Sequence, residues 1–156
     1  MPSPVTDTIG VISDTHGLVR PEAIAALRGC SRLIHAGDVG AADVLAQLGE
    51  IAPIVAVRGN VDTGRWAASL PASLVVELGS HTLYVVHILA DATPPADAAV
   101  VIYGHSHKPS IEDRGGVLCL NPGSAGPRRF KLPVSVARLS VVDGRVTAEI
   151  VELDVA

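Results

Sequence analysis

Short apolar runs alternate with amphipathic stretches along the first 60 residues. The runs at 8–13, 32–37 and 53–59 have the length of buried strands, whereas 20–29 and 41–49 have helical spacing of their apolar residues. The first helix is expected to begin near a proline and to end at a glycine, as helices commonly do. Strand–helix–strand units of this spacing predict parallel strands with helices packed on the sheet.

The second half of the chain predicts hairpins and one further buried strand, at 99–104. Turn residues separate pairs of β-rich stretches at Gly79-Ser80, Gly115-Gly116 and Asp143-Gly144. The last of these is a strong signal for a type I′ turn. We therefore expect a single α/β domain over 1–156 with two packed sheets, the later one mainly antiparallel.

Composition and charge narrow the class of protein. The chain is 48% hydrophobic but only 3% aromatic, so aliphatic side chains must fill the core. The formal net charge is −4, and the basic residues are scattered apart from a cluster at 128–131. This argues against an extended nucleic-acid surface, although a phosphate ester bound at a metal site is compatible with it.

Cysteine usage and the N-terminus predict a cytoplasmic protein. Cys30 and Cys119 lack metal-site or redox spacing, which favours a reducing compartment over a disulfide framework. There is no signal-peptide pattern and no run of about 18 apolar residues that would suggest a membrane span. We expect a soluble protein without membrane contact.

Polar side chains follow the predicted strands at the point where each strand ends. In chain order they are Asp14 and His16, Asp38, Asn60, His87, and His105 with His107. The carboxyl ends of strands line the ligand crevice of open α/β sheets, so we expect these side chains to converge. Residues two apart in an extended segment project to one side, which would pair the first two and the last two.

Seven such groups exceed what one tetrahedral ion requires. They suit two divalent ions about 3.5–4 Å apart that share a carboxylate, an arrangement found in phosphoesterases. Nitrogen and oxygen donors without thiolates fit Mn, Fe, Ni, Co or Zn, of which we favour Mn. Each motif also has a simpler interpretation: Asp14 and Asp38 as helix caps, and Asn60 and Asp62 as turn residues.

The order of the motifs makes a family resemblance specific. D-x-H at 14–16, G-D at 37–38, G-N-x-D at 59–62, His87 and G-H-x-H at 104–107 occur in the order of the calcineurin-like metallophosphoesterase superfamily. The short length and N-P-G-S at 121–124 resemble its small bacterial and archaeal phosphodiesterase branch. The resemblance implies a four-layer αββα fold, two packed mixed sheets flanked by helices.

The resemblance also implies a ligand set and an activity. Asp14, His16 and His107 would hold one ion, and Asn60, His87 and His105 the other, with Asp38 bridging the two. The implied activity is dinuclear hydrolysis of a small phosphodiester through a metal-bridging hydroxide. The alternatives are a phosphomonoesterase on the same site and a non-catalytic scaffold that keeps the fold.

Other positions carry secondary expectations. Asn60 and Arg128 are candidates for binding the substrate phosphate, although Arg128 also fits a solvated basic face. Asp62 is expected to support its loop, His35 to be packed within the protein, and the N-P-G-S loop to lie near the metals. The β-rich edges would allow a homo-oligomer.

The sequence departs from the family pattern at two places. Many relatives have histidine where this chain has Val61, so no general acid is assigned. His87 is followed by Ile88-Leu89 instead of glycine, and the segment 88–103 is short and contains Pro94-Pro95. The lip of the site is therefore expected to be truncated.

Overall fold

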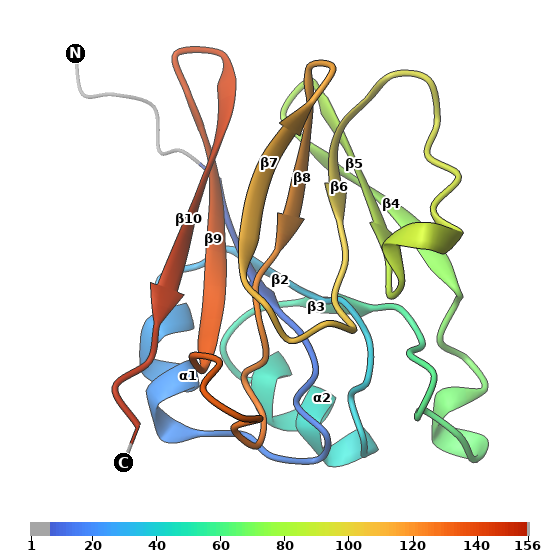
Figure 1. The fold of residues 1–156 in the computed structure, drawn as a ribbon, viewed down its shortest axis with the longest axis vertical. Coiled ribbons are helices and arrows are strands. Elements are labelled where there is room, and N and C mark those ends of the chain that lie inside the picture. Colours follow the sequence, from blue (N-terminus) through green and yellow to red (C-terminus); the bar gives the residue numbers. More distant parts are fainter. Residues whose placement is uncertain (1–6, 156) are drawn as a thin grey trace.

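The computed structural model describes residues 7–155, which form two five-stranded sheets (Figure 1). The first sheet has the order β10-β9-β1-β2-β3. Its strands are β1 (Thr8–Ile12), β2 (Arg32–His35), β3 (Ile54–Ala56), β9 (Ser135–Val142) and β10 (Arg145–Glu152). As predicted, β1, β2 and β3 are parallel. The C-terminal hairpin joins this sheet because β9 pairs antiparallel with β1.

The second sheet has the order β4-β5-β6-β8-β7. Its strands are β4 (Ser73–Leu78), β5 (His81–Val86), β6 (Ala98–Ile102), β7 (Ser110–Arg114) and β8 (Val117–Asn121). The expectation of a mainly antiparallel sheet is wrong. The two outer pairs are antiparallel hairpins, but β6 lies between β5 and β8 and is parallel to both.

The two sheets pack face to face around an aliphatic core. Side chains from both inner faces, including Val11, Ile34, Leu83 and Ile102, are at most 1% exposed. Fully burying one such side chain contributes about 1.5–3 kcal/mol, so aliphatic residues suffice without aromatic ones. The expected pair of packed mixed sheets is confirmed.

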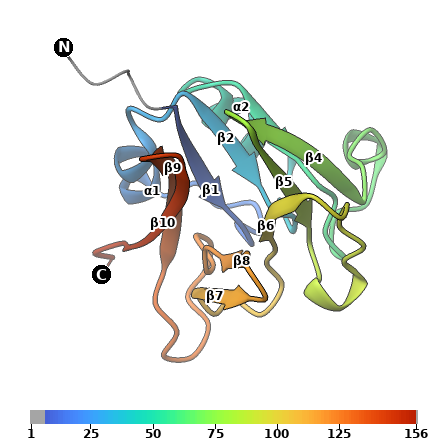
Figure 2. The same ribbon diagram turned by 90° about the horizontal axis from the view of Figure 1, so that it is seen from above.

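In the part of the chain that the structure describes, the two α-helices cover the outer face of the first sheet (Figure 2). They are α1 (Pro21–Leu27) and α2 (Ala42–Gly49), with Leu27 and Leu48 fully buried beneath them. The outer face of the second sheet is covered by the segment after β5, which contains only a 3-10 turn, η2 (Leu89–Asp91). A second 3-10 turn, η1 (Arg65–Ala67), lies between β3 and β4. Within 7–155, no helix is long and apolar enough to span a bilayer.

The predicted type I′ turn is confirmed between β9 and β10. Asp143 and Gly144 both have positive φ, 51° and 78°, as this turn type requires at its two central positions. Gly115 and Gly116 do the same between β7 and β8. These turns set the hairpin registers, and they lie away from the loops that follow the parallel strands.

Candidate metal centre

Two loops extend the pairing of β1 and β2 past the ends of the strands. The Asp14 N–H donates to the Gly37 carbonyl at 3.0 Å, and the His16 N–H donates to the Asp38 carbonyl at 3.0 Å. Because their backbone groups remain paired, the loops are held side by side without regular strand geometry. Asp14, His16 and Asp38 therefore project from one common base.

Left-handed backbone is concentrated at the candidate ligands. Seven non-glycine residues of the described chain have φ between 48° and 74°, and five of them are Asp14, His16, Asp38, His105 and His107. Such conformations cost about 1–3 kcal/mol each and persist where contacts with the surrounding structure hold them in place. The expectation that these pairs lie in extended segments is wrong. Tight loop turns place their side chains together.

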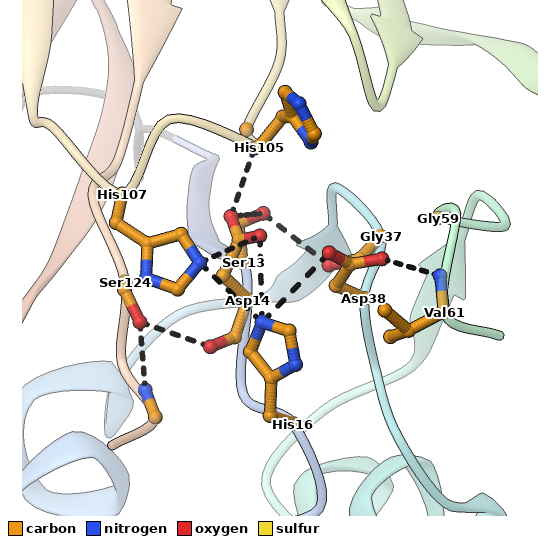
Figure 3. Close-up of polar contacts among 12 residues, drawn as sticks. Ser13, Asp14, His16, Gly37, Asp38, Gly59, Val61, His105, His107 and Ser124 are labelled. Atoms are coloured by element: carbon orange, nitrogen blue, oxygen red, sulfur yellow. Dashed lines mark hydrogen bonds and ion pairs between the residues drawn. The ribbon is translucent and has the colours of Figure 1, made fainter. Parts of the chain in front are cut away.

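Asp14, His16 and His107 form a first group of donors (Figure 3). The Asp14 Oδ1 atom lies 3.4 Å from His107 Nε2 and 3.9 Å from His16 Nε2. The two imidazole nitrogens are 3.4 Å apart. Donors that share one ion at bonds of about 2.1 Å are themselves roughly 3.4 Å apart. The group is compact enough for a single ion.

Asp38, His87 and His105 form a second group, whose ligand atoms all lie within 4.8 Å of one another. The Asp38 Oδ2 atom is 3.1 Å from His87 Nε2 and 3.7 Å from His16 Nε2. One carboxylate oxygen thus faces both groups. His87 is buried and in place despite the short segment that follows it.

The donor atoms of the two groups fit divalent cations. Asp14 Oδ1 and His87 Nε2 are buried and have no hydrogen-bond partner among the described residues. The other polar atoms of both side chains are used: His87 Nδ1 donates to the Ala36 carbonyl at 2.8 Å, and Asp14 Oδ2 accepts the His105 N–H at 3.1 Å. Buried acceptors left unpaired are costly unless a cation takes them.

Burial and the neighbouring charges act against each other at these groups. Burial works to raise the pKa of Asp38, but the adjacent His87 imidazole and the hydrogen bond from the Val61 N–H outweigh it and lower that pKa to about 2. Burial raises the pKa of Asp14. Burial also lowers the pKa of His107 to about 4, with the Arg129 charge adding to the effect. His107 is therefore a neutral imidazole near pH 7, the form that binds metals.

Asp62 supports the site loops, as the sequence predicted. Its buried carboxylate accepts backbone N–H groups of Gly59 at 2.8 Å, Gly40 at 2.9 Å and Val39 at 3.1 Å. These bonds join the loop after β2 to the loop after β3. The interpretation of Asp38 as the cap of α2 is wrong, because Ala41 holds the cap position and no side chain caps it.

The N-P-G-S loop at the end of β8 joins the first and last ligand loops, as expected. Asn121 Nδ2 donates to the Gly104 carbonyl at 3.2 Å, and the Ser124 hydroxyl donates to the Asp14 carbonyl at 2.9 Å. Ser13 was missed by the sequence reasoning, although it directly precedes Asp14. Its hydroxyl donates to Asp14 Oδ2 at 2.7 Å and so leaves Oδ1 free.

His35 lies beneath these loops in a chain of hydrogen bonds. The Gly37 N–H donates to His35 Nδ1 at 3.1 Å, so the ring proton sits on Nε2 and is donated to the Thr15 hydroxyl at 2.9 Å. That hydroxyl donates to the Val39 carbonyl at 2.8 Å. A packed histidine was expected, and its role in tying the first two loops together was not.

We expect His35 to make stability depend on pH. Burial lowers the pKa of His35 from 6.5 to about 3. In the unfolded chain this histidine is therefore protonated below about pH 6.5, whereas in the folded protein it stays neutral down to about pH 3. Stability contributed by His35 is therefore lost as the pH falls through this window. Between pH 7.5 and 5.0 the wild type should lose about 2 kcal/mol more unfolding free energy than His35→Gln. Urea unfolding of EDTA-treated protein measures this, and parallel pH profiles would refute it.

The remaining predicted residues lie at the rim. Asn60 is exposed and lines a hollow beside His87. Arg128 is exposed, while the charge of its neighbour Arg129 is felt at His107. Val61 is 43% exposed, and its backbone N–H donates to Asp38 Oδ1 at 3.1 Å.

This chain has two mixed sheets and a centre rich in Asp and His at the ends of their strands. These features define the metallophosphoesterase class of folds. Residues 8–144 match the family model described as a calcineurin-like phosphoesterase superfamily domain. The chain belongs to this superfamily, whose members use divalent metals.

Individual relatives agree with this assignment. A probable metallophosphoesterase of Methanothermobacter thermautotrophicus is 34% identical, covering 92% of this chain and 91% of the relative. Phosphodiesterase YfcE of Escherichia coli is 29% identical over 81% of this chain and 84% of its own length. A YfcE structure covers 94% of this chain and 100% of that chain, with a TM-score of 0.70. Vps29 of Chaetomium thermophilum, 21% identical, covers 94% and 99% with a TM-score of 0.74 and shares the fold alone.

Proposed function

We propose that this chain is a dinuclear metal-dependent phosphodiesterase. The proposal depends chiefly on one observation, that Asp38 Oδ2 faces His16 of the first donor group and His87 of the second. A carboxylate in this position is suited to two ions at once. The superfamily and the phosphodiesterase name of YfcE support hydrolysis of a phosphodiester.

In this proposal, one ion is held by Asp14, His16 and His107. Asn60, His87 and His105 would hold the other, and Asp38 would be shared; the ligand atoms of Asp38, His87 and His105 lie close together. The donors are imidazole, carboxylate and amide groups, which suit Mn, Fe, Ni, Co or Zn, with Mn favoured. When bound, such ions supply a water of lowered pKa as nucleophile and positive charge against the phosphate oxygens.

The side chains of the protein would position the ester for that chemistry. The Val61 N–H and the imidazole of His87 fix the shared carboxylate. Asn60 at the rim would bind a phosphate oxygen, and Arg128 or Arg129 would add positive charge on the side of His107. The hydrogen-bonded loops beneath keep these groups in place before the substrate arrives, which lowers the cost of reorganisation.

The proposal is tested by comparing metal-stripped and Mn-reloaded protein on bis(p-nitrophenyl) phosphate and p-nitrophenyl phosphate. We expect about two bound ions per chain, activity only after reloading, and faster hydrolysis of the diester. Faster hydrolysis of the monoester would indicate a phosphomonoesterase. Metal binding without turnover of either ester would indicate a scaffold.

The side chain of Val61 predicts a steep dependence of rate on the leaving group. It is exposed at the rim and cannot donate a proton, so alcohols of high pKa should leave slowly. We expect Val61→His to accelerate release of an alkyl alcohol about 100-fold, the usual effect of a general acid. Release of p-nitrophenol should change less than about threefold, because it needs no acid.

The control for this prediction is Val61→Gln, which is polar but does not titrate. Rates across a series of aryl and alkyl diesters measure the effect. A flat dependence in the wild type, or equal acceleration by histidine and glutamine, would contradict the role given to this position.

A further inference from the structure

A hollow of about 420 Å³ opens beside the metal centre, on the side of Asn60 and His87. Its floor is formed by Tyr84 and Val86 of β5, which face outward from the second sheet. Hollows of roughly 300–1,000 Å³ are the size at which proteins bind small molecules. Because the hollow adjoins the metal centre, a substituent of an ester bound at that centre could extend into it.

One wall of the hollow is fixed by hydrogen bonds. The Thr93 N–H donates to the Tyr84 hydroxyl at 3.2 Å, and the Thr93 hydroxyl lies 3.5 Å from the same atom. Tyr84 is only 4% exposed, so this contact fastens the segment after β5 to the sheet. The short segment after β5 therefore folds back on that strand beside the hollow.

The two charged side chains that line the hollow have opposite signs. Arg58 and Asp91 both line it, both are exposed, and no salt bridge pairs either of them within residues 7–155. A second anion would be attracted by one and repelled by the other. Ser73 and Thr93, which carry hydroxyl groups, also line the hollow. The polar lining thus suits a neutral group that both donates and accepts hydrogen bonds.

Part of the remaining lining is apolar. Ala72, Val86 and Ile88 offer a surface against which a flat or compact apolar face can pack. Apolar surface beside placed polar groups is a usual feature of a specific small-molecule site.

We propose that this hollow binds one organic substituent of the phosphodiester and selects a neutral, hydroxyl-bearing group of nucleoside size. This inference rests on the proposed function. Water attacks phosphorus, the bond from phosphorus to the departing alcohol breaks, and that alcohol takes up a proton. The substituent in the hollow stays esterified to the phosphate. Arg58, Ser73 and Asp91 become determinants of specificity without taking part in the chemistry.

Two diesters with the same leaving group test the inference: thymidine 5′-(p-nitrophenyl phosphate) and methyl p-nitrophenyl phosphate. The Mn-loaded wild type should have at least about a tenfold higher kcat/KM for the nucleoside ester, mainly through a lower KM. Ser73→Trp, which fills the hollow, should reduce this ratio to near one.

The matched control is Val75→Trp, an exposed position of the same strand that does not line this hollow. It should keep the wild-type ratio. A wild type without preference, or an unchanged ratio in Ser73→Trp, overturns the inference while the proposed function stands.

If neither diester is hydrolysed, the proposed function is refuted, but the inference about the hollow can still be tested by calorimetry. The measurement compares the affinity for thymidine 5′-monophosphate with the affinity for methyl phosphate. We expect at least about tenfold tighter binding of the nucleotide by the wild type and by Val75→Trp, and no preference in Ser73→Trp. Equal binding of both ligands by the wild type would refute it.

Discussion

Asp38→Asn is expected to lower kcat on bis(p-nitrophenyl) phosphate by about 1,000-fold or more. Asparagine has the volume of aspartate and keeps an oxygen to accept the Val61 N–H. It removes the negative charge at the atom that faces both donor groups. The loss should therefore appear in metal content and rate, with little change in the fold.

Metal content by mass spectrometry and kcat with saturating Mn measure this prediction together. Bound metal should fall from about two ions per chain to one or fewer. Asp97→Asn is the control, because this carboxylate is exposed and belongs to neither donor group. A variant that retains both ions and more than about a tenth of the activity would rule out the sharing of Asp38.

Gly59→Ala is expected to destabilise the protein by about 3 kcal/mol or more and to abolish metal binding. A Cβ atom at this position would lie 2.1 Å from the Asp38 backbone nitrogen and 2.2 Å from Asp38 Oδ1. Neither atom can retreat, because the loop of Asp38 is paired with the loop of His16. The clash would displace the shared carboxylate itself.

Gly49→Ala is the matched control for this prediction. A Cβ atom there would meet only Ile54, at 3.7 Å, which is ordinary contact. Since the residue lies in α2, alanine should be neutral or stabilise by up to about 1 kcal/mol. Urea unfolding gives both values. Similar midpoints for the two variants would show that the close approach at Gly59 is not essential.

The candidate donor residues could be located from the sequence because strand ends are a local signal. An apolar run followed by Asp, His or Asn is visible in the sequence, and parallel strands bring such ends to one edge. Asp62 could be predicted to support its loop for a related reason, because its short side chain reaches nearby backbone N–H groups.

Contacts between residues distant in sequence could not be predicted. Ser124 reaches the Asp14 carbonyl across 110 positions, and His35 reaches Thr15 across 20. Serine, threonine and histidine are common inside proteins, so their type alone does not distinguish a supporting role. The mixed second sheet was missed for a similar reason. Strand β6 pairs with β8 and not with β7, the next strand in the chain, and an apolar strand does not specify its partner.

By itself, the sequence determined which side chains could bind metal, where the strands end and where the hairpins turn, because these depend on local backbone preference and hydrophobic period. Only the tertiary structure decided how those side chains meet. Five candidate ligands adopt left-handed backbone conformations, which non-glycine residues adopt only rarely. Hydrogen bonds between the loops hold Asp14 and His16 in these conformations. The hollow beside Asn60 likewise exists because Tyr84 holds Thr93 against the sheet. Such features arise from packing between distant segments, to which local preference contributes little.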